Sequence, residues 1–376
     1  MRNEILNGAV LGENLVFAKE LDKTVAAAIS DIEAQAKRYS NNSLASTTGF
    51  VAESYHVSNY NIKSALSRKS LHAFREKNGN HGDYFIKDMK TGKIIEQGEM
   101  KFYSTAEKTE NAMRGYGDRK LVGPKEQLED IKNIARRREL SNKNTRPHVA
   151  KEHKTVGKNV ADKIGDDRLS SDPKTLKEMK KLAKKAKKGN VKAIDAMPEM
   201  KEATVSALKS GALEGVKNGA IYGGGFSLVM NGIDVVKGEK DLKTALKDTS
   251  VDVVKSVADG AVKSAAASAA KTASLYVAEK TASNVAKTVL RSSAPVVVAV
   301  SAVEVGKHAV DLVKGEIDGE EFVEKSTKTV ATTAAGYAGA EIGAAIGTAI
   351  CPGIGTVIGG VVGGMAGSLG ISTLFD

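Results

Sequence analysis

The stretch that decides the fold of the N-terminal region is DYFIKDMKTGKIIEQGEMKFY, residues 83–103. Residues 83–88 and 94–103 are both β-prone, and the turn-like sequence KTGK at 90–93 separates them. Two β-prone runs around a glycine-containing turn predict a β-hairpin.

The second strand of this hairpin carries a charged pair. Side chains alternate between the two faces of a strand, so Glu99 and Lys101 share one face, and Met100 and Phe102 turn to the other. Asp83 opens the first strand, where the hairpin register can bring it near Glu99. The pattern predicts two carboxylates and an ammonium group in one place.

Two carboxylates beside a lysine suit metal-assisted chemistry on a phosphodiester. Their oxygens can hold a divalent cation, and hard oxygen ligands favour Mg²⁺ or Mn²⁺ over Zn²⁺. Such a cation acidifies a water, while Lys101 positions the nucleophile or neutralises charge. Two plainer interpretations stay open: Glu99 and Lys101 can form an ordinary surface ion pair, and Asp88 is a rival to Asp83.

Helices are expected on both sides of the hairpin. Helical spacing of apolar residues predicts helices at 21–38 and about 46–66 before it, and at 105–114 and 125–138 after it, with a short strand at 120–122. The expected fold is therefore α+β, with a small mixed sheet flanked by helices, followed by an all-α, Ala/Gly-rich C-terminal region.

The order helix acid, strand aspartate, then acid-x-lysine resembles the PD-(D/E)xK (restriction-endonuclease-like) nucleases over about residues 40–140. The resemblance implies that Asp83 and Glu99 bind the metal, that Lys101 is the catalytic lysine, and that Glu53 in GFVAESYH completes the site. The family's proline is absent, because Gly82 precedes Asp83.

Further local patterns resemble a bacterial group of such nucleases: His56 with Asn61 in ESYHVSNYN, and Gln127 in GPKEQLEDIK. Some relatives carry Gln where Glu99 stands. His56 follows Glu53 by three residues and shares its helix face, so it can contact a phosphate or orient a water, or it can be structural. Gln127 is an auxiliary candidate, and a surface helix residue is the alternative.

Composition narrows the choice of chemistry. The 376 residues include one cysteine, Cys351, and six histidines without an HExxH or HxH pattern, which argues against disulfide frameworks and zinc-hydrolase sites. The net charge of +11 indicates a polyanionic partner, either nucleic acid or an anionic lipid surface. The acidic residues near the N-terminus argue against a cleavable signal peptide and for a cytosolic N-terminal domain.

Changes in composition predict three regions: a nuclease-like domain at 1–140, a basic helical linker at 141–200, and an Ala/Gly-rich helical repeat region at 201–376. In the middle region, residues 176–189 hold seven lysines against one glutamate, which is typical of a solvated helix or of a clamp for phosphates or anionic headgroups. In the last region, DVVKGEKD at 234–241 recurs as DLVKGEID at 311–318.

The C-terminal tail carries glycines at four-residue spacing, at positions 339, 343 and 347 and again at 355, 359, 363 and 367. This spacing leaves a ridge without side chains on each helix, so two helices can approach closely. With a turn at 351–353, a glycine-zipper hairpin is expected over about 335–375. The uncharged stretch 342–375 indicates a membrane span or membrane association; a tightly packed soluble hairpin is the alternative.

Together these features predict a Mg²⁺-dependent endo- or exonuclease that acts on DNA rather than RNA. Its nuclease domain would lie in the cytoplasm, attached to the inner face of the cell membrane by the hairpin, with homo-oligomers as a further possibility. Such an architecture suggests a role in phage defence or mobile-element conflict. The alternative is a membrane-active glycine-zipper protein, a pore former or effector, whose N-terminal domain binds nucleic acid or a partner without cutting.

Overall fold

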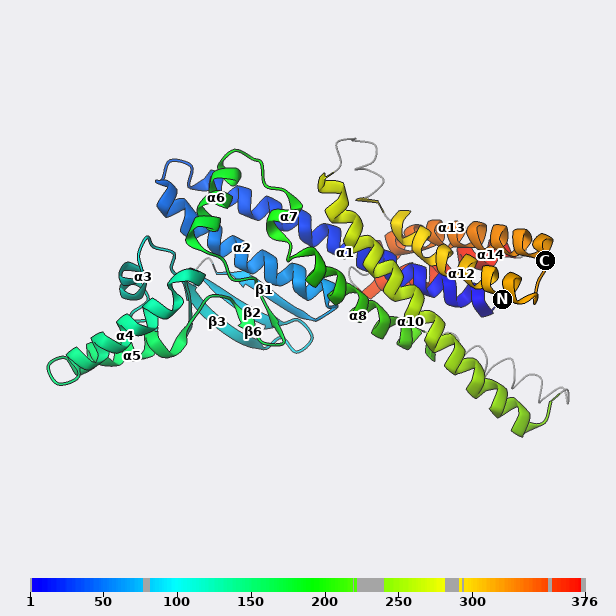
Figure 1. Cartoon of the computed structure of the whole chain (residues 1–376), viewed down its shortest axis with the longest axis horizontal. Coiled ribbons are helices and arrows are strands. Elements are labelled where there is room, and N and C mark those ends of the chain that lie inside the picture. The colour runs from blue at the N-terminus through cyan, green and yellow to red at the C-terminus, as the bar shows by residue number, and fades with distance from the viewer. Residues whose placement is uncertain are drawn as a thin grey trace. The chain divides into compact units, whose positions relative to one another are not determined.

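The computed structural model describes residues 2–76, 82–218, 220–221, 240–280, 291–292, 294–350 and 354–372. Its internal contacts divide the chain into two compact units. One is formed by Met1–Asp22 together with Met200–Asp376, and the other by Lys23–Glu199. Helix α1 (Arg2–Arg38) contributes residues to both units (Figure 1).

The unit Lys23–Glu199 combines helices with a small mixed sheet. After α1 its helices are α2 (Leu44–Leu66), α3 (Ala106–Ala112), the 3-10 helix η1 (Lys125–Gln127), α4 (Leu128–Asn142), α5 (Pro147–Asn159), α6 (Leu176–Lys187) and α7 (Ala193–Ala196). Its strands are β1 (Leu71–Arg75), β2 (Tyr84–Asp88), β3 (Ile94–Met100), β4 (Lys120–Val122), β5 (Val160–Ala161), β6 (Gly165–Asp166) and β7 (Leu169–Ser170). The α+β class with a mixed sheet is confirmed.

The main sheet has the strand order β1-β2-β3-β4-β5. β1, β2 and β3 pair antiparallel, whereas β4 lies parallel to both β3 and β5. The predicted hairpin is confirmed as β2–β3, with Tyr84 opposite Gly98. β3 ends at Met100, earlier than the expected Tyr103, because the chain turns toward α3, where the Thr105 hydroxyl accepts a hydrogen bond from the Lys108 amide.

Residues 141–200 do not form the expected linker; they complete this unit. α5 packs against α4, β5 extends the main sheet, and α6 packs against α2. The apolar face of α6 includes Leu176, Met179 and Leu182, which are buried. Burial of this face holds the lysine-rich helix against the rest of the unit. The prediction of a linker was wrong because it followed the many lysines and overlooked the apolar residues that lie between them at helical spacing.

The other unit is all helical in its described part, as expected. Besides the first part of α1 it contains α8 (Met200–Asn218), α10 (Leu242–Lys280), α12 (Ala294–Lys314), α13 (Gly319–Ile350) and α14 (Ile354–Ser372). The second copy of the predicted repeat, 311–318, lies at the end of α12 and in the link to α13. The first copy, 234–241, lies outside the described residues except for its last two positions.

α13 and α14 form the predicted glycine-zipper hairpin. A methyl group at Gly343 would overlap the carbonyl oxygen of Gly359, and one at Gly339 would overlap that of Gly363. The two backbones therefore touch where the side chains are missing. The predicted turn at 351–353 lies outside the described residues, and none of the described helices combines the length and apolarity needed to cross a bilayer.

A third helix joins the zipper, which the sequence prediction missed. Gly8 and Gly12 of α1 pack against the backbone of α14 at Gly364 and Gly360. α14 therefore presents one glycine ridge to α13 and a second ridge to α1. The signal was present in the sequence as two glycines four residues apart, but a single pair of this kind is common in proteins.

Candidate active site

Three of the predicted site residues meet where β3 ends. The Lys101 ammonium donates hydrogen bonds to Glu99 Oε2 and to Asp83 Oδ2, both at 3.0 Å. Glu99 is buried, whereas Asp83 and Lys101 are partly exposed. The strand alternation thus places the acid and the lysine together as predicted, and the hairpin supplies the second acid.

Backbone contacts fix the position of Asp83. Its amide donates to the Gly98 carbonyl at 2.8 Å, and its Oδ2 accepts a hydrogen bond from the Met100 amide at 2.7 Å. The preceding Gly82 has a φ of +90°. A proline, whose ring holds φ near about −65°, cannot adopt this conformation. The backbone conformation at Gly82 therefore excludes a proline at this position.

Glu53, on α2, interacts electrostatically with the same group. Burial raises the pKa of its carboxyl to about 8, and the negative charge of Asp83 adds to this effect, while Arg75 and Lys101 oppose it. These interactions require Glu53 to lie near the Asp83–Glu99–Lys101 group. Asp83, Glu99 and Lys101 therefore meet through hydrogen bonds, and Glu53 interacts with them electrostatically from α2.

Arg119 completes the group and was missed by the sequence analysis. Its Nη1 donates to Glu99 Oε1 at 2.8 Å, so Glu99 is held between a lysine and an arginine. Arg119 immediately precedes β4, and the parallel pairing of β4 with β3 brings it beside Glu99. Nothing in the local sequence around Arg119 indicated this parallel pairing.

The group has strongly coupled charges. Burial and the nearby Asp83 raise the pKa of Glu99, and Lys101 opposes both effects. For Lys101, burial disfavours the ammonium form, but the carboxylates of Asp83 and Glu99 outweigh it and raise its pKa. Lys101 is therefore a cation under physiological conditions, able to neutralise an anion and unable to act as a general base.

The carboxyl groups are suitable ligands for a hard divalent cation. All the donors are oxygens, and the pKa values of Glu53 and Glu99 are raised partly by repulsion between carboxylates, which a cation would relieve. In the arrangement described, the Lys101 ammonium bridges Asp83 and Glu99, and no three Asp, Glu, His or Cys side chains of the described residues are grouped to hold a metal ion.

His56 lies in a different environment from the one expected for a phosphate contact. The ring is fully buried, and its Nδ1 lies 2.7 Å from Ser171 Oγ. Burial, with a contribution from Lys174, lowers the pKa of His56 to about 3. The ring also contacts Phe102, on the apolar face of the hairpin. Of the two interpretations that the sequence left open, the structure favours the structural one.

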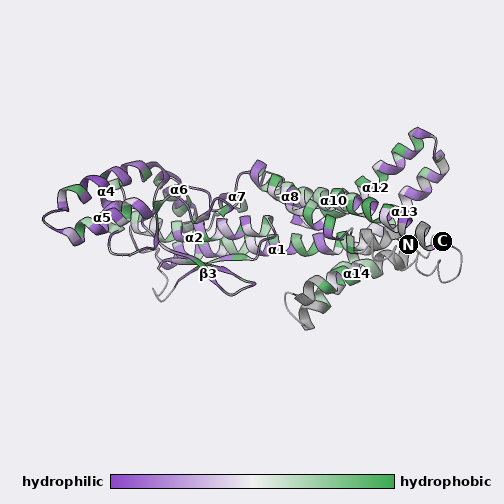
Figure 2. Ribbon diagram, turned by 90° about the horizontal axis from the view of Figure 1, so that it is seen from below, coloured by the Kyte–Doolittle hydropathy of each residue, from purple (hydrophilic) through white to green (hydrophobic). Residues whose placement is uncertain are grey.

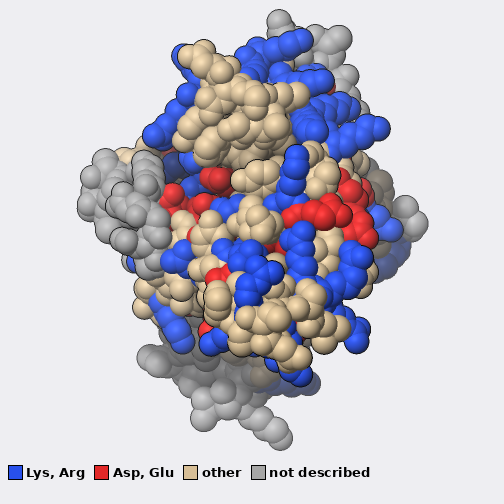
Figure 3. Space-filling model, turned by 90° about the vertical axis from the view of Figure 1, so that its left-hand side faces the viewer, with Lys and Arg blue, Asp and Glu red and all other residues tan. Residues whose placement is uncertain are grey.

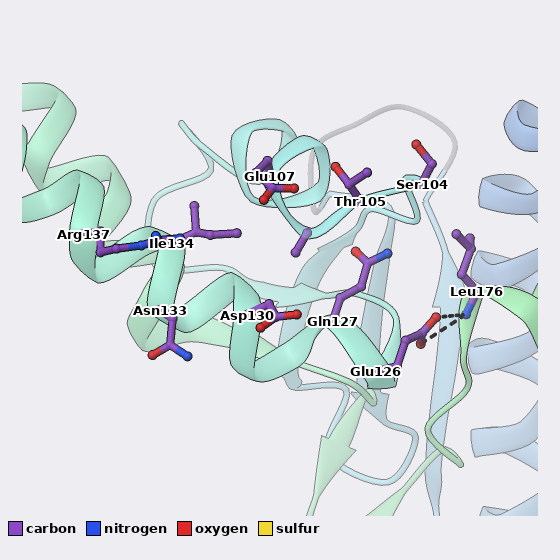
Figure 4. Close-up of a pocket in the computed structure, with 11 residues that line it drawn as sticks. Ser104, Thr105, Glu107, Glu126, Gln127, Asp130, Asn133, Ile134, Arg137 and Leu176 are labelled. Carbon is purple, nitrogen blue, oxygen red and sulfur yellow. Dashed lines mark hydrogen bonds between the residues drawn. The ribbon is translucent and has the colours of Figure 1, made fainter.

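Gln127 is buried beside the segment that follows β3 (Figure 4). Its Nε2 donates to the Tyr103 carbonyl at 3.0 Å, and its Oε1 accepts from Thr109 Oγ1 at 2.7 Å. Gln127 therefore fixes the chain just beyond Lys101 and ties it to α3. It lines a pocket together with Ser104, Thr105, Ala106, Glu107, Glu126, Asp130, Asn133, Ile134, Arg137 and Leu176.

Asp88, the rival acid, belongs to the turn of the hairpin. Its Oδ1 accepts hydrogen bonds from the Lys90 amide at 2.9 Å and from the Ser70 hydroxyl at 3.0 Å. These hydrogen bonds lower its pKa. Between Asp83 and Asp88, the structure places Asp83 in the group with Glu99 and Lys101.

Comparison with known families identifies one part of the chain. Residues 319–374 match the family model described as C13G5.2-like, glycine zipper domain. The match covers α13 and α14 and agrees with the hairpin expected from the glycine spacing. No curated protein and no solved structure gives a significant match to the chain.

Proposed function

We propose that the unit Lys23–Glu199 is a metal-dependent nuclease of the PD-(D/E)xK type that hydrolyses phosphodiester bonds. The observation that carries this proposal is the convergence of Asp83, Glu99 and Lys101, with both carboxylates 3.0 Å from one ammonium group. An ordinary surface ion pair would not need a buried Glu99, a fixed Asp83 and a third acid, Glu53, with a raised pKa.

In this mechanism Asp83 and Glu99 would hold Mg²⁺ or Mn²⁺, and Glu53 would be a third carboxylate near them. The bound cation would supply an acidified water. Lys101 stabilises the negative charge that develops on the phosphate, and Arg119 keeps Glu99 oriented. Water adds to phosphorus and one P–O ester bond breaks, leaving a phosphate monoester and an alcohol that takes up the proton.

The test is cleavage of duplex and single-stranded DNA and of RNA by the full chain, in Mg²⁺ and in EDTA. We expect Mg²⁺-dependent cleavage of DNA that Lys101→Met reduces at least about a hundredfold. Lys93→Met, at an exposed position in the hairpin turn, is the matched control and should cut like the wild type. Equal behaviour of wild type and Lys101→Met on every substrate would remove the proposal.

A second candidate is association with a membrane through the α13–α14 hairpin. It is supported by the glycine-zipper family match and by the absence of charged side chains at 342–372. In this case the protein would attach its N-terminal domain to the cytoplasmic face of the cell membrane, in keeping with a role in defence or mobile-element conflict. Flotation with lipid vesicles tests this: wild type should float, whereas a chain ending at Gly336 should stay in solution.

A further inference from the structure

Helix α6 and Lys188, which directly follows it, carry a row of exposed lysines. Lys177, Lys181, Lys184 and Lys188 are all exposed and follow one another at spacings of four, three and four residues, which places them on one side of the helix. The first and last lysines are eleven helical steps apart, or about 16 Å at about 1.5 Å per residue. The opposite face of α6 is buried against α2.

These four lysines are not used in the fold. Within the described residues none of them has an ion pair or a hydrogen-bond partner for its ammonium group. The one acid of the helix, Glu178, is held in the capping box with Thr175. An unpaired row of like charges repels itself, so it is stabilised when an anion with repeated charges binds it.

The hairpin of α4 and α5 is a second basic element, and Figure 2 shows that hydrophilic residues dominate it. It too has exposed basic side chains for which no ion pair is found in the described part of the chain. These residues are Arg136, Lys143, Arg146, Lys151, Lys154 and Lys158. The acids Glu129 and Glu152 are already paired with Lys132 and Arg114.

Both basic elements start beside the end of β3. The Lys125 amide donates to the Lys174 carbonyl at 2.9 Å, and Glu126 accepts from the Leu176 amide at 3.0 Å, so η1 and the start of α6 are tied together. The next residue, Gln127, holds the Tyr103 carbonyl. In Figure 3, Lys and Arg side chains are scattered among uncharged residues over this face, and acidic side chains gather across its middle.

We infer that the α6 lysine row and the α4–α5 hairpin, which both start near the end of β3, bind the phosphate backbones of a nucleic-acid duplex. Single-strand binders use exposed aromatic rings on which bases stack. Among the described residues of this unit, Tyr103 is the one exposed Phe or Tyr side chain, and the unit has no Trp. Lysines contact phosphates as point charges, without base readout, so binding should be independent of sequence. The inference rests on the proposed nuclease function for its biological meaning.

The test is the affinity of the full chain for a fluorescent duplex and for its separate strands, in EDTA and over a range of salt concentrations. The variant replaces Lys177, Lys181, Lys184 and Lys188 with glutamine, a good helix former. The control makes the same change of charge at four exposed lysines of the helical unit, Lys201, Lys209, Lys247 and Lys255.

We expect the wild type and the control to bind the duplex more tightly than either strand. In the α6 variant, the slope of log affinity against log salt should fall by about 3 to 4, at about 0.9 per lost phosphate contact. An unchanged slope would overturn the inference. The same proteins are also tested for binding to anionic vesicles. If the α6 variant loses binding to the vesicles but still binds the duplex like the wild type, the inference is overturned as well. If the protein binds the duplex but does not cleave it, this inference is supported and the proposed catalytic function fails.

Discussion

The two units use glycine for different purposes. In the unit Lys23–Glu199, six described glycines have positive φ, and one of them, Gly82, sets the backbone beside the acid–lysine group. In the helical unit, glycines such as Gly343 and Gly363 lie inside regular helices and remove side chains where two backbones touch. The first unit therefore depends on local backbone conformation and buried charge, and the second depends on close helix packing.

The first of these tests, with the largest change in stability, concerns the half-buried carboxyl of Glu53. Its pKa is raised from 4.5 to about 8, so the folded unit loses stability as the pH rises from about 4.5 to about 8 and Glu53 ionises. Glu53→Gln removes this cost. At pH 8.5 the variant should be more stable than the wild type by roughly 4 kcal/mol, with little difference at pH 4.5.

Hydrogen exchange of α2 peptides measures this difference, with α13 peptides as the internal control. The change should be confined to the unit Lys23–Glu199, and the variant should lose cleavage while it gains stability. If the exchange of α2 depends on pH in the same way in Glu53→Gln and in the wild type, Glu53 is not buried among the other acids.

The next effect concerns the zipper. Gly343→Ala places a methyl group against the Gly359 carbonyl and should destabilise the helical unit by about 1–3 kcal/mol. Gly306→Ala, in α12, has open space around the new methyl group and should be neutral or stabilising by up to about 1 kcal/mol. Thermal unfolding followed by circular dichroism compares the two variants, and equal midpoints would contradict close packing at Gly343.

The smallest effect concerns Arg119, which supports Glu99 from β4. Arg119→Met removes a charge-assisted hydrogen bond of 2.8 Å, so the cleavage rate should fall about tenfold, less than for Lys101→Met. Arg119→Lys should restore part of the rate, because it keeps the charge. Single-turnover cleavage gives these rates; a loss as large as that of Lys101→Met would give Arg119 a direct role in the reaction.

Much of the candidate site could be predicted because its residues are close in sequence. Asp83, Glu99 and Lys101 belong to one hairpin, and the alternation of a strand and a short turn determine which side chains meet. Glu53 was placed by the family resemblance, since periodicity alone does not say which face of α2 meets the hairpin. The α13–α14 hairpin was predictable for a similar reason, because the glycine period is local.

The features that were missed depend on contacts distant in sequence. Arg119 reaches Glu99 through parallel pairing of β3 and β4, and Gly8 reaches Gly364 across almost the whole chain. The burial of His56 depends on Ser171, more than a hundred residues away. The role of 141–200 was mistaken because its charges are obvious in the sequence, whereas its buried residues are recognised only against α2 and α4.

We propose that the acids around Lys101 hold a divalent cation against a phosphodiester backbone. The most direct measurement is Mn²⁺ binding by electron paramagnetic resonance, on the full chain with a cleavage-resistant phosphorothioate duplex. We expect Mn²⁺ to bind to the wild type and to Lys93→Met, and binding to be lost in the double variant Asp83→Asn, Glu99→Gln. Equal binding by all three proteins, or none by the wild type, would contradict it.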